Sequence, residues 1–461
     1  MFIGRARETE ALNSFYEKAK ERVACVYGRA GMGKTSLLRE FAKDKKTIFF
    51  TAYATTDQAE LALLASAIGV RKTPSSLEEL LDEVTAIGRR EPVLLIIDHY
   101  PNFVKANSKY DKILHDFVAE KWVRMPVKLI LCGDSYLAME KKVYGKKALW
   151  KDVISLVLEV SPMDFFDSRK FFPDASPEDA LLYYGMTGGI PHALSNLAGD
   201  VEGSITRLFL RQEDDVTLLP EKTLSTELRE LSYYNRMLAT LASGKTRVNA
   251  ISEEVNKPKD IVVPYMNTLM SIGVVKKENP VTEKTNRKKT RYSIKSTFDR
   301  FWYQFVVPNI ALYYTGETDR LISEYIMPQL TDFRQLVFTN MCREYLLREN
   351  ESATLPFIIN EIGNWWENDE EKHTTDGFDL VALGDNSGKD AIIFARCYYT
   401  DRPIEISTLK ALIELTKHAK YKNERDIFYL VFSSCGFHEN TQTVAATIRN
   451  IMLISLDDIC K

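Results

Sequence analysis

Eight residues near the N-terminus have the composition and spacing of a loop that binds phosphate. Residues 28–35 read Gly-Arg-Ala-Gly-Met-Gly-Lys-Thr and fit the pattern G-x-x-x-x-G-K-[ST]. Glycines let successive backbone N–H groups converge on phosphate oxygens, and a following helix adds the positive end of its dipole. The Lys34 ammonium would reach the β- and γ-phosphates, and the Thr35 hydroxyl would ligate Mg²⁺. The pattern therefore predicts a site for ATP and Mg²⁺, with the nucleotide contacted by Gly28, Gly31, Gly33, Lys34, Thr35 and Ser36.

A second apolar run ends in the carboxylate that such a site needs. Residues 94–98 read Leu-Leu-Ile-Ile-Asp, so Asp98 would hold Mg²⁺ directly or through water. The next residue is His99, whose neutral imidazole can accept a proton and has an ordinary pKa of about 6.5. Two interpretations stay open. Either His99 acts as a base, with Asp98 and Lys34 as the other catalytic residues, or it merely fills the position and hydrolysis is slow or absent.

A third apolar run ends in Leu131-Cys132-Gly133, followed by Asp134 and Ser135. A polar side chain at this point would lie beside the γ-phosphate and sense it. The negative charge of Asp134 is unfavourable near phosphate unless it meets a metal or a cation. The alternative is a simple turn at the end of a strand.

The elements that position these residues alternate along the N-terminal part of the chain. Apolar runs at 23–27, 47–52, 93–98, 127–132 and 156–160 are separated by helical stretches, which predicts a parallel α/β sheet. The run at 47–52 intervenes between the glycine loop and Asp98. That spacing is typical of the ATPase-type sheet and not of the simpler kinase-type sheet.

The pattern changes after the sheet. Residues 178–215 look helical, with a break at Gly188-Gly189-Ile190-Pro191. Three short helices near 226–243, 248–256 and 259–272 then precede a hairpin with strands at 274–277 and 290–294. This order is the outline of a winged helix-turn-helix.

The hairpin is strongly basic. Residues 276–291 hold seven basic and two acidic side chains, a local net charge of +5. Such a wing can contact a DNA backbone; the alternatives are a solvated hairpin or a surface for a protein partner. The helix at 259–272 offers little that could read bases, so we expect backbone contact and not sequence-specific binding. The candidate nucleic-acid residues are Lys276, Lys277, Arg287, Lys288, Lys289 and Arg291.

Composition sets the remaining limits. A chain of 461 residues exceeds what one hydrophobic core supports, so two or three domains are expected. The net charge of −3 excludes a protein that coats nucleic acid over its whole surface. Six scattered cysteines without a CxxC pair argue against zinc and disulfides. No apolar run has the length of a membrane span and no signal peptide is apparent, so we expect a cytoplasmic protein without membrane contact.

Taken together, the chain resembles the archaeal-type ATPases of the signal-transducing P-loop class, which are AAA-like and carry a winged helix and a C-terminal nuclease-like domain of unknown function. The resemblance implies that Pro191 packs near the nucleotide. It also implies a γ-phosphate contact near position 146, where this chain has Lys146 in place of the usual arginine; lysine keeps the charge but loses the bidentate fork. Besides the loop, Asp98 and residues 131–133, the motifs that carry it are Phe2-Ile3-Gly4-Arg5 with Glu8 and Leu12, Gly189-Ile190-Pro191, residues 280–284, Arg300-Phe301-Trp302, and residues 362–366, 378–382 and 433–437.

For the C-terminal domain the resemblance implies a PD-(D/E)xK nuclease fold. Asp379 matches the first metal ligand of that motif. Where Glu-x-Lys should follow, the chain has Arg396-Cys397-Tyr398, and a cation at the position of an anionic ligand opposes metal binding. We therefore expect no nuclease activity. The alternative recruits another carboxylate, such as Glu361 or Asp376.

The expected fold is α/β: a P-loop NTPase parallel sheet followed by a winged helix domain and an α/β restriction-endonuclease-like domain. The expected boundaries are 1–170 for the ATPase core, 171–220 for a helical lid, 221–297 for the winged helix and 298–461 for a degenerate nuclease-like domain. Three functions remain open. They are a nucleotide-controlled switch, an ATP-dependent nucleic-acid enzyme with an active nuclease domain, and a DNA- or protein-binding module with structural ATP. The sequence leaves the oligomeric state open.

Overall fold

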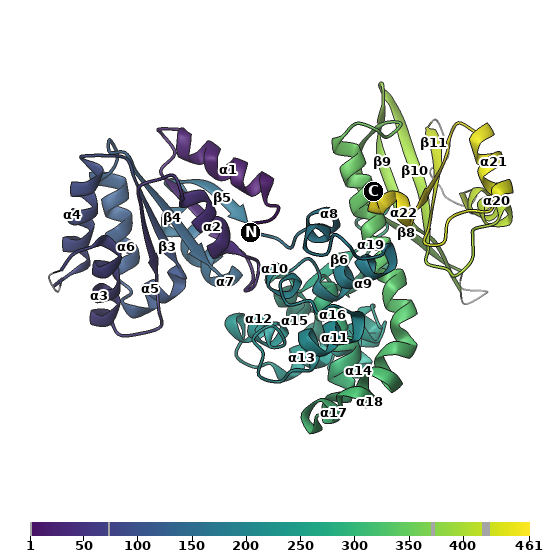
Figure 1. Cartoon of the computed structure of the whole chain (residues 1–461), viewed down its shortest axis with the longest axis horizontal. Coiled ribbons are helices and arrows are strands. Elements are labelled where there is room, and N and C mark those ends of the chain that lie inside the picture. Colours follow the sequence, from purple (N-terminus) through teal and green to yellow (C-terminus); the bar gives the residue numbers. More distant parts are fainter. Residues whose placement is uncertain (1, 72–73, 370–373, 417–424) are drawn as a thin grey trace. The chain divides into compact units, whose positions relative to one another are not determined.

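The computed structural model describes residues 2–71, 74–369, 374–416 and 425–461, without the side chains of 368–369 and 374–376. Its contacts group the chain into two compact units (Figure 1). The first comprises residues 1–163, 190–195 and 213–231. The second comprises residues 164–189, 196–212 and 232–461. The four boundaries expected from the sequence stay a prediction.

The first unit is built on a five-stranded parallel sheet, which confirms the predicted α/β class for this part. The strand order is β2-β3-β4-β1-β5, and every pairing is parallel. All residues of β3 are buried, as expected when helices cover both faces of a sheet. The strands are β1 (Val23–Tyr27), β2 (Thr47–Thr51), β3 (Val93–Asp98), β4 (Val127–Gly133) and β5 (Ile154–Glu159).

The sheet order refines the expectation for residues 47–52. They form β2, which lies at the edge of the sheet, and the strand between β1 and β3 is β4. Strand order in a parallel sheet follows the crossover helices and not the order in the chain. As a result, the loop after β1 and the residues that follow β4 and β3 meet at the carboxyl ends of three adjacent strands.

Helices flank the sheet on both sides. Figure 1 shows α3, α4, α5 and α6 on one side and α1 and α2 on the other. The first group packs its apolar side chains with β1 and β3 into one hydrophobic cluster that includes Leu64, Leu81 and Phe103. The bounds are α1 (Ala6–Glu17), α2 (Lys34–Ala42), α3 (Asp57–Ile68), α4 (Leu77–Gly88), α5 (Tyr100–Ala106), α6 (Tyr110–Asp116) and α7 (Tyr136–Met139).

Two later helices belong with the first unit, namely α10 (Pro191–Leu194) and α12 (Leu219–Glu227). The helix predicted near 226–243 is present over Ser232–Ala242 (α13), and residues 226–227 belong instead to the end of α12. Leu228 has an extended backbone, which ends α12, and the next helix begins only at Ser232.

The second unit begins with a helical core rich in aromatic side chains. The rings of Phe209 and Phe301 stack with their centroids 4.3 Å apart, and Phe298, Phe305 and Phe333 join them. Its helices are α8 (Phe165–Ser168), α9 (Pro177–Thr187), α11 (Val201–Ile205), α13 (Ser232–Ala242), α14 (Val248–Val255), α15 (Lys259–Ser271), α16 (Thr297–Phe301), α17 (Ile310–Thr315), α18 (Thr318–Arg320) and α19 (Leu330–Glu351).

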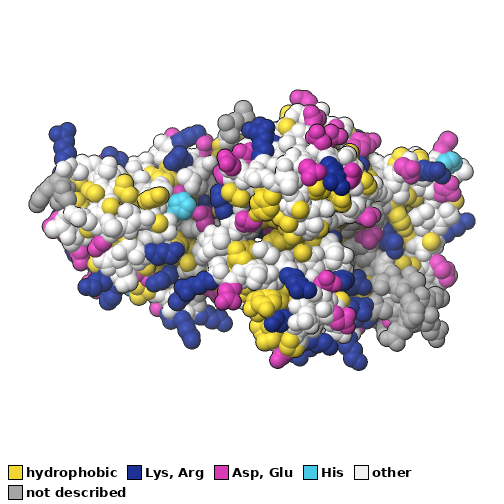
Figure 2. Space-filling view, turned by 90° about the horizontal axis from the view of Figure 1, so that it is seen from below, with side chains coloured by type: hydrophobic (Ala, Val, Ile, Leu, Met, Phe, Trp, Pro, Cys, Tyr) yellow, Lys and Arg dark blue, Asp and Glu magenta, His cyan; other side chains and the backbone are white. Residues whose placement is uncertain are grey.

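The C-terminal part of this unit is a mixed sheet with the order β12-β11-β10-β9-β8. Strands β8 to β10 pair antiparallel, and β10 to β12 pair parallel. The elements are β8 (Ile358–Asp369), β9 (Thr374–Asn386), β10 (Lys389–Tyr398), α20 (Ile406–Leu415), β11 (Asp426–Ser433), α21 (Glu439–Thr447), β12 (Ile451–Ser455) and α22 (Leu456–Cys460). Within the described ranges, no helix is both long and apolar enough to span a bilayer. Basic and acidic side chains are interspersed over the face seen in Figure 2.

The predicted hairpin is present as β6 (Val275–Glu278) and β7 (Arg291–Ile294), and the segment between its strands packs against β8. Val281 is 5% exposed and shares a hydrophobic cluster with Trp365 of β8. Its backbone N–H donates to the Asn364 carbonyl at 2.9 Å. A Cβ on Gly363 would lie 3.0 Å from the Val281 Cβ, so the glycine permits this close approach. The hairpin is therefore part of the packing of the C-terminal sheet.

This docking predicts a stability effect. Val281→Ala removes two buried methyl groups and should lower the free energy of unfolding by about 1–3 kcal/mol, measured by urea denaturation of the full chain. Lys288→Ala, at an exposed position of the same hairpin, should change it by less than about 0.5 kcal/mol. Equal effects of the two substitutions would contradict the packing role of Val281.

Candidate nucleotide site

The glycine loop joins β1 to α2 at the carboxyl end of the sheet. A Cβ on Gly28 would lie 2.4 Å from the Val160 carbonyl oxygen, so only glycine allows the loop to begin this close to the end of β5. Gly33, directly before α2, has a φ of +79°, in the left-handed region that favours glycine. The glycines predicted from the motif therefore meet definite steric requirements of this loop.

Arg5, near the N-terminus, holds the glycine loop in place. Its side chain is 4% exposed and donates to the carbonyl oxygens of Ser161 at 2.6 Å and Met32 at 2.9 Å. It also pairs with Glu8 at 2.6 Å. The first motif of the sequence thus has a structural role, because it ties the glycine loop to the chain that follows β5.

The cation of the loop is held by three oxygen acceptors. The Lys34 ammonium donates to the carbonyl oxygens of Gly28 and Arg29, each at 2.8 Å, and forms an ion pair with the Asp134 carboxylate. Beside it, the Thr35 hydroxyl donates to Asp98 at 2.7 Å. The structure therefore brings together the glycine loop, Asp98 at the end of β3 and Asp134 after β4.

The second oxygen of Asp134 contacts His99. The distance from His99 Nδ1 to Asp134 Oδ2 is 3.2 Å. This hydrogen bond raises the pKa of His99 above its ordinary value, against the opposing effect of burial. Burial also acts to raise the pKa of Asp134, but the hydrogen bond from His99 and the charge of Lys34 outweigh it and lower that pKa to about 2. Because Asp134 stays ionised, it favours the protonated imidazolium, which cannot accept a proton from water.

The loop lines a cavity of about 410 Å³. Pro191, predicted to pack near the nucleotide, is in its wall. Lys146, predicted to contact the γ-phosphate, is exposed and is not among the residues that line the cavity. The lining residues are Ala30, Gly31, Gly33, Lys34, Thr35, Ser36, His99, Asp134, Pro191, His192, Ser195, Asp215, Leu219 and Lys222.

Part of this wall was not found from the sequence. His192 donates its backbone N–H to the Gly31 carbonyl at 3.1 Å, and its ring lies 3.0 Å from Asp215. Asp215 and Lys222 come from the segment that contains α12. No motif marks these residues, and they follow the loop by more than 150 positions, so only the fold could reveal them.

The helix α12 contacts the site at two points. Near its middle, the Thr223 hydroxyl accepts from the Arg29 guanidinium at 3.0 Å. At its end, the Glu227 carboxylate accepts from the Ser135 hydroxyl at 2.8 Å and from the backbone N–H of Leu137 at 3.2 Å. A further bond comes from the backbone N–H of Tyr136. Burial raises the pKa of Glu227, and these three bonds oppose that effect.

The groups at this site fit a nucleoside triphosphate with Mg²⁺. The glycine loop, the Lys34 ammonium and the Thr35 hydroxyl line the same cavity. The Asp98 carboxylate accepts the hydrogen bond of that hydroxyl. Mg²⁺ is usually held by one or two protein ligands together with phosphate and water. In the part of the chain that the structure describes, no group of three or more His, Cys, Asp or Glu side chains could hold a metal by itself. Thr35 and Asp98 are thus the candidate ligands, and Mg²⁺ would supply neutralisation of phosphate charge.

The six hairpin cations fall into two groups. Lys276 pairs with Glu278 at 2.9 Å, Lys289 pairs with Glu283 at 2.7 Å, and the Arg291 guanidinium lies 4.4 Å from the centre of the Trp366 ring. Lys277, Arg287 and Lys288 are exposed and make no ion pair with any residue in the described ranges. Nucleic-acid contact by this hairpin stays a prediction.

The C-terminal carboxylate Asp379 is paired with a cation. Its Oδ2 lies 3.3 Å from Arg396 Nε and accepts the Cys397 backbone N–H at 2.8 Å. The pKa of Asp379 is raised by burial, against the effects of Cys397 and Arg396. Of the alternative carboxylates, Glu361 is paired with Lys284 at 2.6 Å, and the side chain of Asp376 lies outside the described residues.

The triad of Lys34, Asp134 and His99 generates a prediction about proton binding. In the wild type, the imidazole of His99 should titrate above about 6.5, and Asp134→Asn should lower its pKa because the ionised acceptor is gone. The measurement is an NMR titration of the His99 ring signals. By linkage, the His99 contribution to stability should be complete below about pH 6.5 and lost as the pH rises through the raised pKa.

A matched control removes a carboxylate elsewhere. Asp116→Asn, at the end of α6 and outside the cavity, should leave the His99 titration as in the wild type. A His99 titration that is the same with and without Asp134 would contradict the proposed cause of the shift.

Comparisons with known proteins found two family models that match parts of the chain. Residues 2–197 match the model of a family described as an ATPase domain predominantly from Archaea. Residues 302–412 match a model for archaeal and bacterial proteins of unknown function.

Similar whole chains were also found. An uncharacterised protein of Methanocaldococcus jannaschii is 27% identical over 396 residues, which cover 84% of this chain and 86% of the relative. Among solved structures, a Walker-type ATPase of Pyrococcus abyssi has a TM-score of 0.46 and 18% identity, covering 66% of this chain and 96% of that one. The ORC2 protein of Aeropyrum pernix has a TM-score of 0.46 and 15% identity, covering 68% and 96%. Residues 2–197, which match this ATPase model, contain the glycine loop, Asp98 and Asp134.

Proposed function

We propose that the chain is a nucleotide-controlled switch that binds ATP with Mg²⁺ and hydrolyses it slowly or not at all. The observation that carries this proposal is the double contact of α12 with the site, through Arg29 of the glycine loop and through the turn after β4. After α12, the chain continues through residues 228–231 into α13 of the second unit. Helix α12 is thus one of the segments through which the chain runs from the phosphate site to the second unit.

In this proposal, the switch responds to ATP through competition between phosphate and Asp134 for the Lys34 ammonium. The Lys34 ammonium forms an ion pair with Asp134. Phosphate groups would compete with Asp134 for this ammonium, because the negative charges of phosphate and carboxylate repel each other around one buried cation. The residues that follow Asp134 are the ones that Glu227 binds, namely Ser135, Tyr136 and Leu137. A shift of Asp134 on ATP binding would therefore reach α12 directly.

The same triad accounts for slow turnover. Lys34 would stabilise the charge of the phosphates, and Thr35 and Asp98 would hold Mg²⁺. His99 occupies the position of a general base, but its pKa is raised by the hydrogen bond to Asp134. Protonation of His99 removes the lone pair that would accept a proton from the attacking water, so the raised pKa weakens this residue as a base. Binding and release of nucleotide, more than its hydrolysis, would then set the state of the switch.

The expected division into ATPase core, helical lid, winged helix and degenerate nuclease-like domain forms part of this proposal. The order of α13, α14 and α15 followed by the β6–β7 hairpin supports the winged helix. The ion pair of Asp379 with Arg396 speaks against an active nuclease, since the cation occupies the acceptor that a metal would need. Protein that nicks plasmid DNA with Mg²⁺, and stops doing so with Asp379→Ala, would restore the nuclease alternative.

The switch has a direct test by hydrogen exchange of the full chain with and without Mg²⁺-ATP. ATP should change amide exchange in the wild type both at α7 and in the second unit. Lys34→Ala should abolish ATP binding in calorimetry and all of these changes, because it removes the ammonium of the phosphate cradle. Glu227→Gln should bind ATP within about threefold of the wild type but lose the change in the second unit, since the amide cannot accept all three bonds at α7.

The control is Glu221→Gln, an exposed position on the same helix, which should behave as the wild type. An absence of ATP affinity in the wild type would refute nucleotide binding altogether. Normal ATP binding with an unchanged second unit would refute the switch but leave the nucleotide site intact.

The role of His99 can be tested by a change in rate. His99→Glu should increase the single-turnover rate of ATP hydrolysis by about tenfold or more, because it supplies a carboxylate that can orient and deprotonate water. The double variant with Lys34→Ala should show no hydrolysis above the buffer rate. A rate in His99→Glu equal to or below that of the wild type would mean that the identity of residue 99 does not limit turnover.

A further inference from the structure

The connection between α7 and β5 of the first unit carries a group of lysines. Residues 141–151 contain five basic and no acidic side chains, a local net charge of +5 in a chain whose net charge is −3. Four of the five lysines are exposed and the other is partly exposed. In the part of the chain that the structure describes, none of the five makes an ion pair or a side-chain hydrogen bond. This lysine surface consists of Lys141, Lys142, Lys146, Lys147 and Lys151.

The backbone that carries the lysine surface is fixed by buried side chains. Val143 and Trp150 are fully buried and belong to the hydrophobic core of the first unit. The Tyr144 ring stacks on the Tyr27 ring of β1 with the two centroids 4.6 Å apart. The Trp150 indole N–H donates to the Asp111 carboxylate at 2.7 Å. Because the core sets the path of this segment, its charges are in place before a ligand binds, and little backbone has to be ordered on binding.

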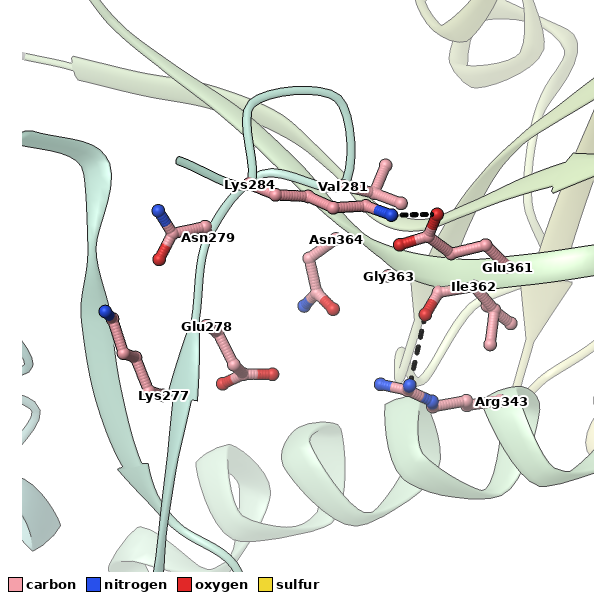
Figure 3. Close-up of a pocket in the computed structure, with 10 residues that line it drawn as sticks. All are labelled: Lys277, Glu278, Asn279, Val281, Lys284, Arg343, Glu361, Ile362, Gly363 and Asn364. Carbon is pink, nitrogen blue, oxygen red and sulfur yellow. Dashed lines mark hydrogen bonds and ion pairs between the residues drawn. The ribbon is translucent and has the colours of Figure 1, made fainter. Parts of the chain in front are cut away.

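The basic hairpin of the second unit offers fewer unpaired cations. Its Lys284 reaches across to Glu361 of β8 at 2.6 Å (Figure 3). Its Lys277 points away from the space that Arg343 faces, so these two cations do not meet (Figure 3). With the paired cations described above, three exposed hairpin cations remain without an ionic partner in the described ranges, against five in residues 141–151.

The chemistry of the lysine surface fits a phosphate backbone. An ammonium is a point charge without the fixed fork of a guanidinium, so lysines neutralise phosphates and do not read bases. A membrane surface would require a row of exposed apolar side chains beside the cations. Among residues 141–151, all of which the structure describes, Leu149 is the only large apolar side chain that is exposed.

We propose that the lysine surface binds the sugar-phosphate backbone of a nucleic-acid duplex without preference for its sequence. A duplex carries one negative charge per about 1.7 Å of its axis, so several of the five ammonium groups can meet phosphates at once and release counterions. Acidic side chains on a folded protein rarely form so dense a row of charge. This binding surface does not depend on the nucleotide site or on the proposed switch.

The test is fluorescence anisotropy of a labelled DNA duplex of about 20 base pairs, titrated with the full chain at low salt. The wild type should bind the duplex. The triple variant Lys141→Gln, Lys147→Gln and Lys151→Gln should weaken binding by about tenfold or more, because three charges that neutralise phosphates are gone. It should also make the dependence of log Kd on log salt shallower by roughly 2–3, since each phosphate contact contributes about 0.9. These side chains are exposed and unpaired within the described ranges, so the urea midpoint of the variant should match that of the wild type.

Two other triple variants remove the same charge elsewhere. One, in the hairpin, combines Lys277→Gln, Arg287→Gln and Lys288→Gln. The other, at exposed positions of the first unit outside the lysine surface, combines Lys20→Gln, Arg89→Gln and Arg90→Gln. Both should bind the duplex within about threefold of the wild type. A loss in either variant as large as that in the lysine-surface variant would overturn the assignment, and so would a wild type that does not bind the duplex.

Two further probes identify the class of ligand. An RNA duplex of the same sequence distinguishes the two sources of the backbone: a preference of about tenfold names the natural one, and equal affinity assigns the surface to the phosphates of either. Poly-glutamate is a polyanion without phosphate and should bind at least about tenfold more weakly than the duplex. Poly-glutamate that binds as tightly as the duplex would contradict the proposal and assign the surface to an acidic protein.

Discussion

The ion pair between Lys34 and Asp134 is the interaction on which the rest of the N-terminal site depends. It satisfies the cation of the glycine loop and, together with the hydrogen bond from His99, lowers the pKa of Asp134 to about 2. Asp134 in turn raises the pKa of His99, against the opposing charge of Lys34. One carboxylate thus ties together the loop after β1, the residue after β3 and the turn after β4. Under the proposed function, an anion that enters the cavity competes with Asp134 for this ammonium.

The C-terminal part of the chain also contains an ion pair between a carboxylate and a cation, but its surroundings differ. Asp379 also meets a cation, Arg396, but here the guanidinium donates to the Gly377 carbonyl at 2.6 Å and the carboxylate accepts the Cys397 backbone N–H at 2.8 Å. In the first site a ligand with several negative charges can compete for the cation. In the second, the positive charge of the guanidinium opposes binding of a metal cation. Similar pairs of charges therefore favour ligand exchange in one place and a fixed structure in the other.

Sequence reasoning recovered the parts of the molecule that depend on local chemistry. The glycine loop, Asp98 and the five strands of the first sheet follow from residue types whose steric and electrostatic requirements act over a few positions. The strand between β1 and β3 and the wall residues His192 and Lys222 could not be predicted, because crossover order and long-range packing decide them. The ion pairs and the aromatic contact of the hairpin cations were not predicted either. A count of charges cannot reveal that Arg291 stacks on Trp366 or that Lys289 meets Glu283.

The path of the chain has a consequence for how this protein can be divided. The backbone passes from one unit to the other at residues 163, 189, 195, 212 and 231, so neither unit is a continuous stretch of sequence. A fragment that stops after β5 would keep every residue of the glycine loop and yet lose Pro191, Leu219 and Thr223, the groups that cover it. Excision of the ATPase domain as a contiguous piece would therefore leave its binding loop uncovered, and recombination at a single junction cannot transplant the intact site into another protein.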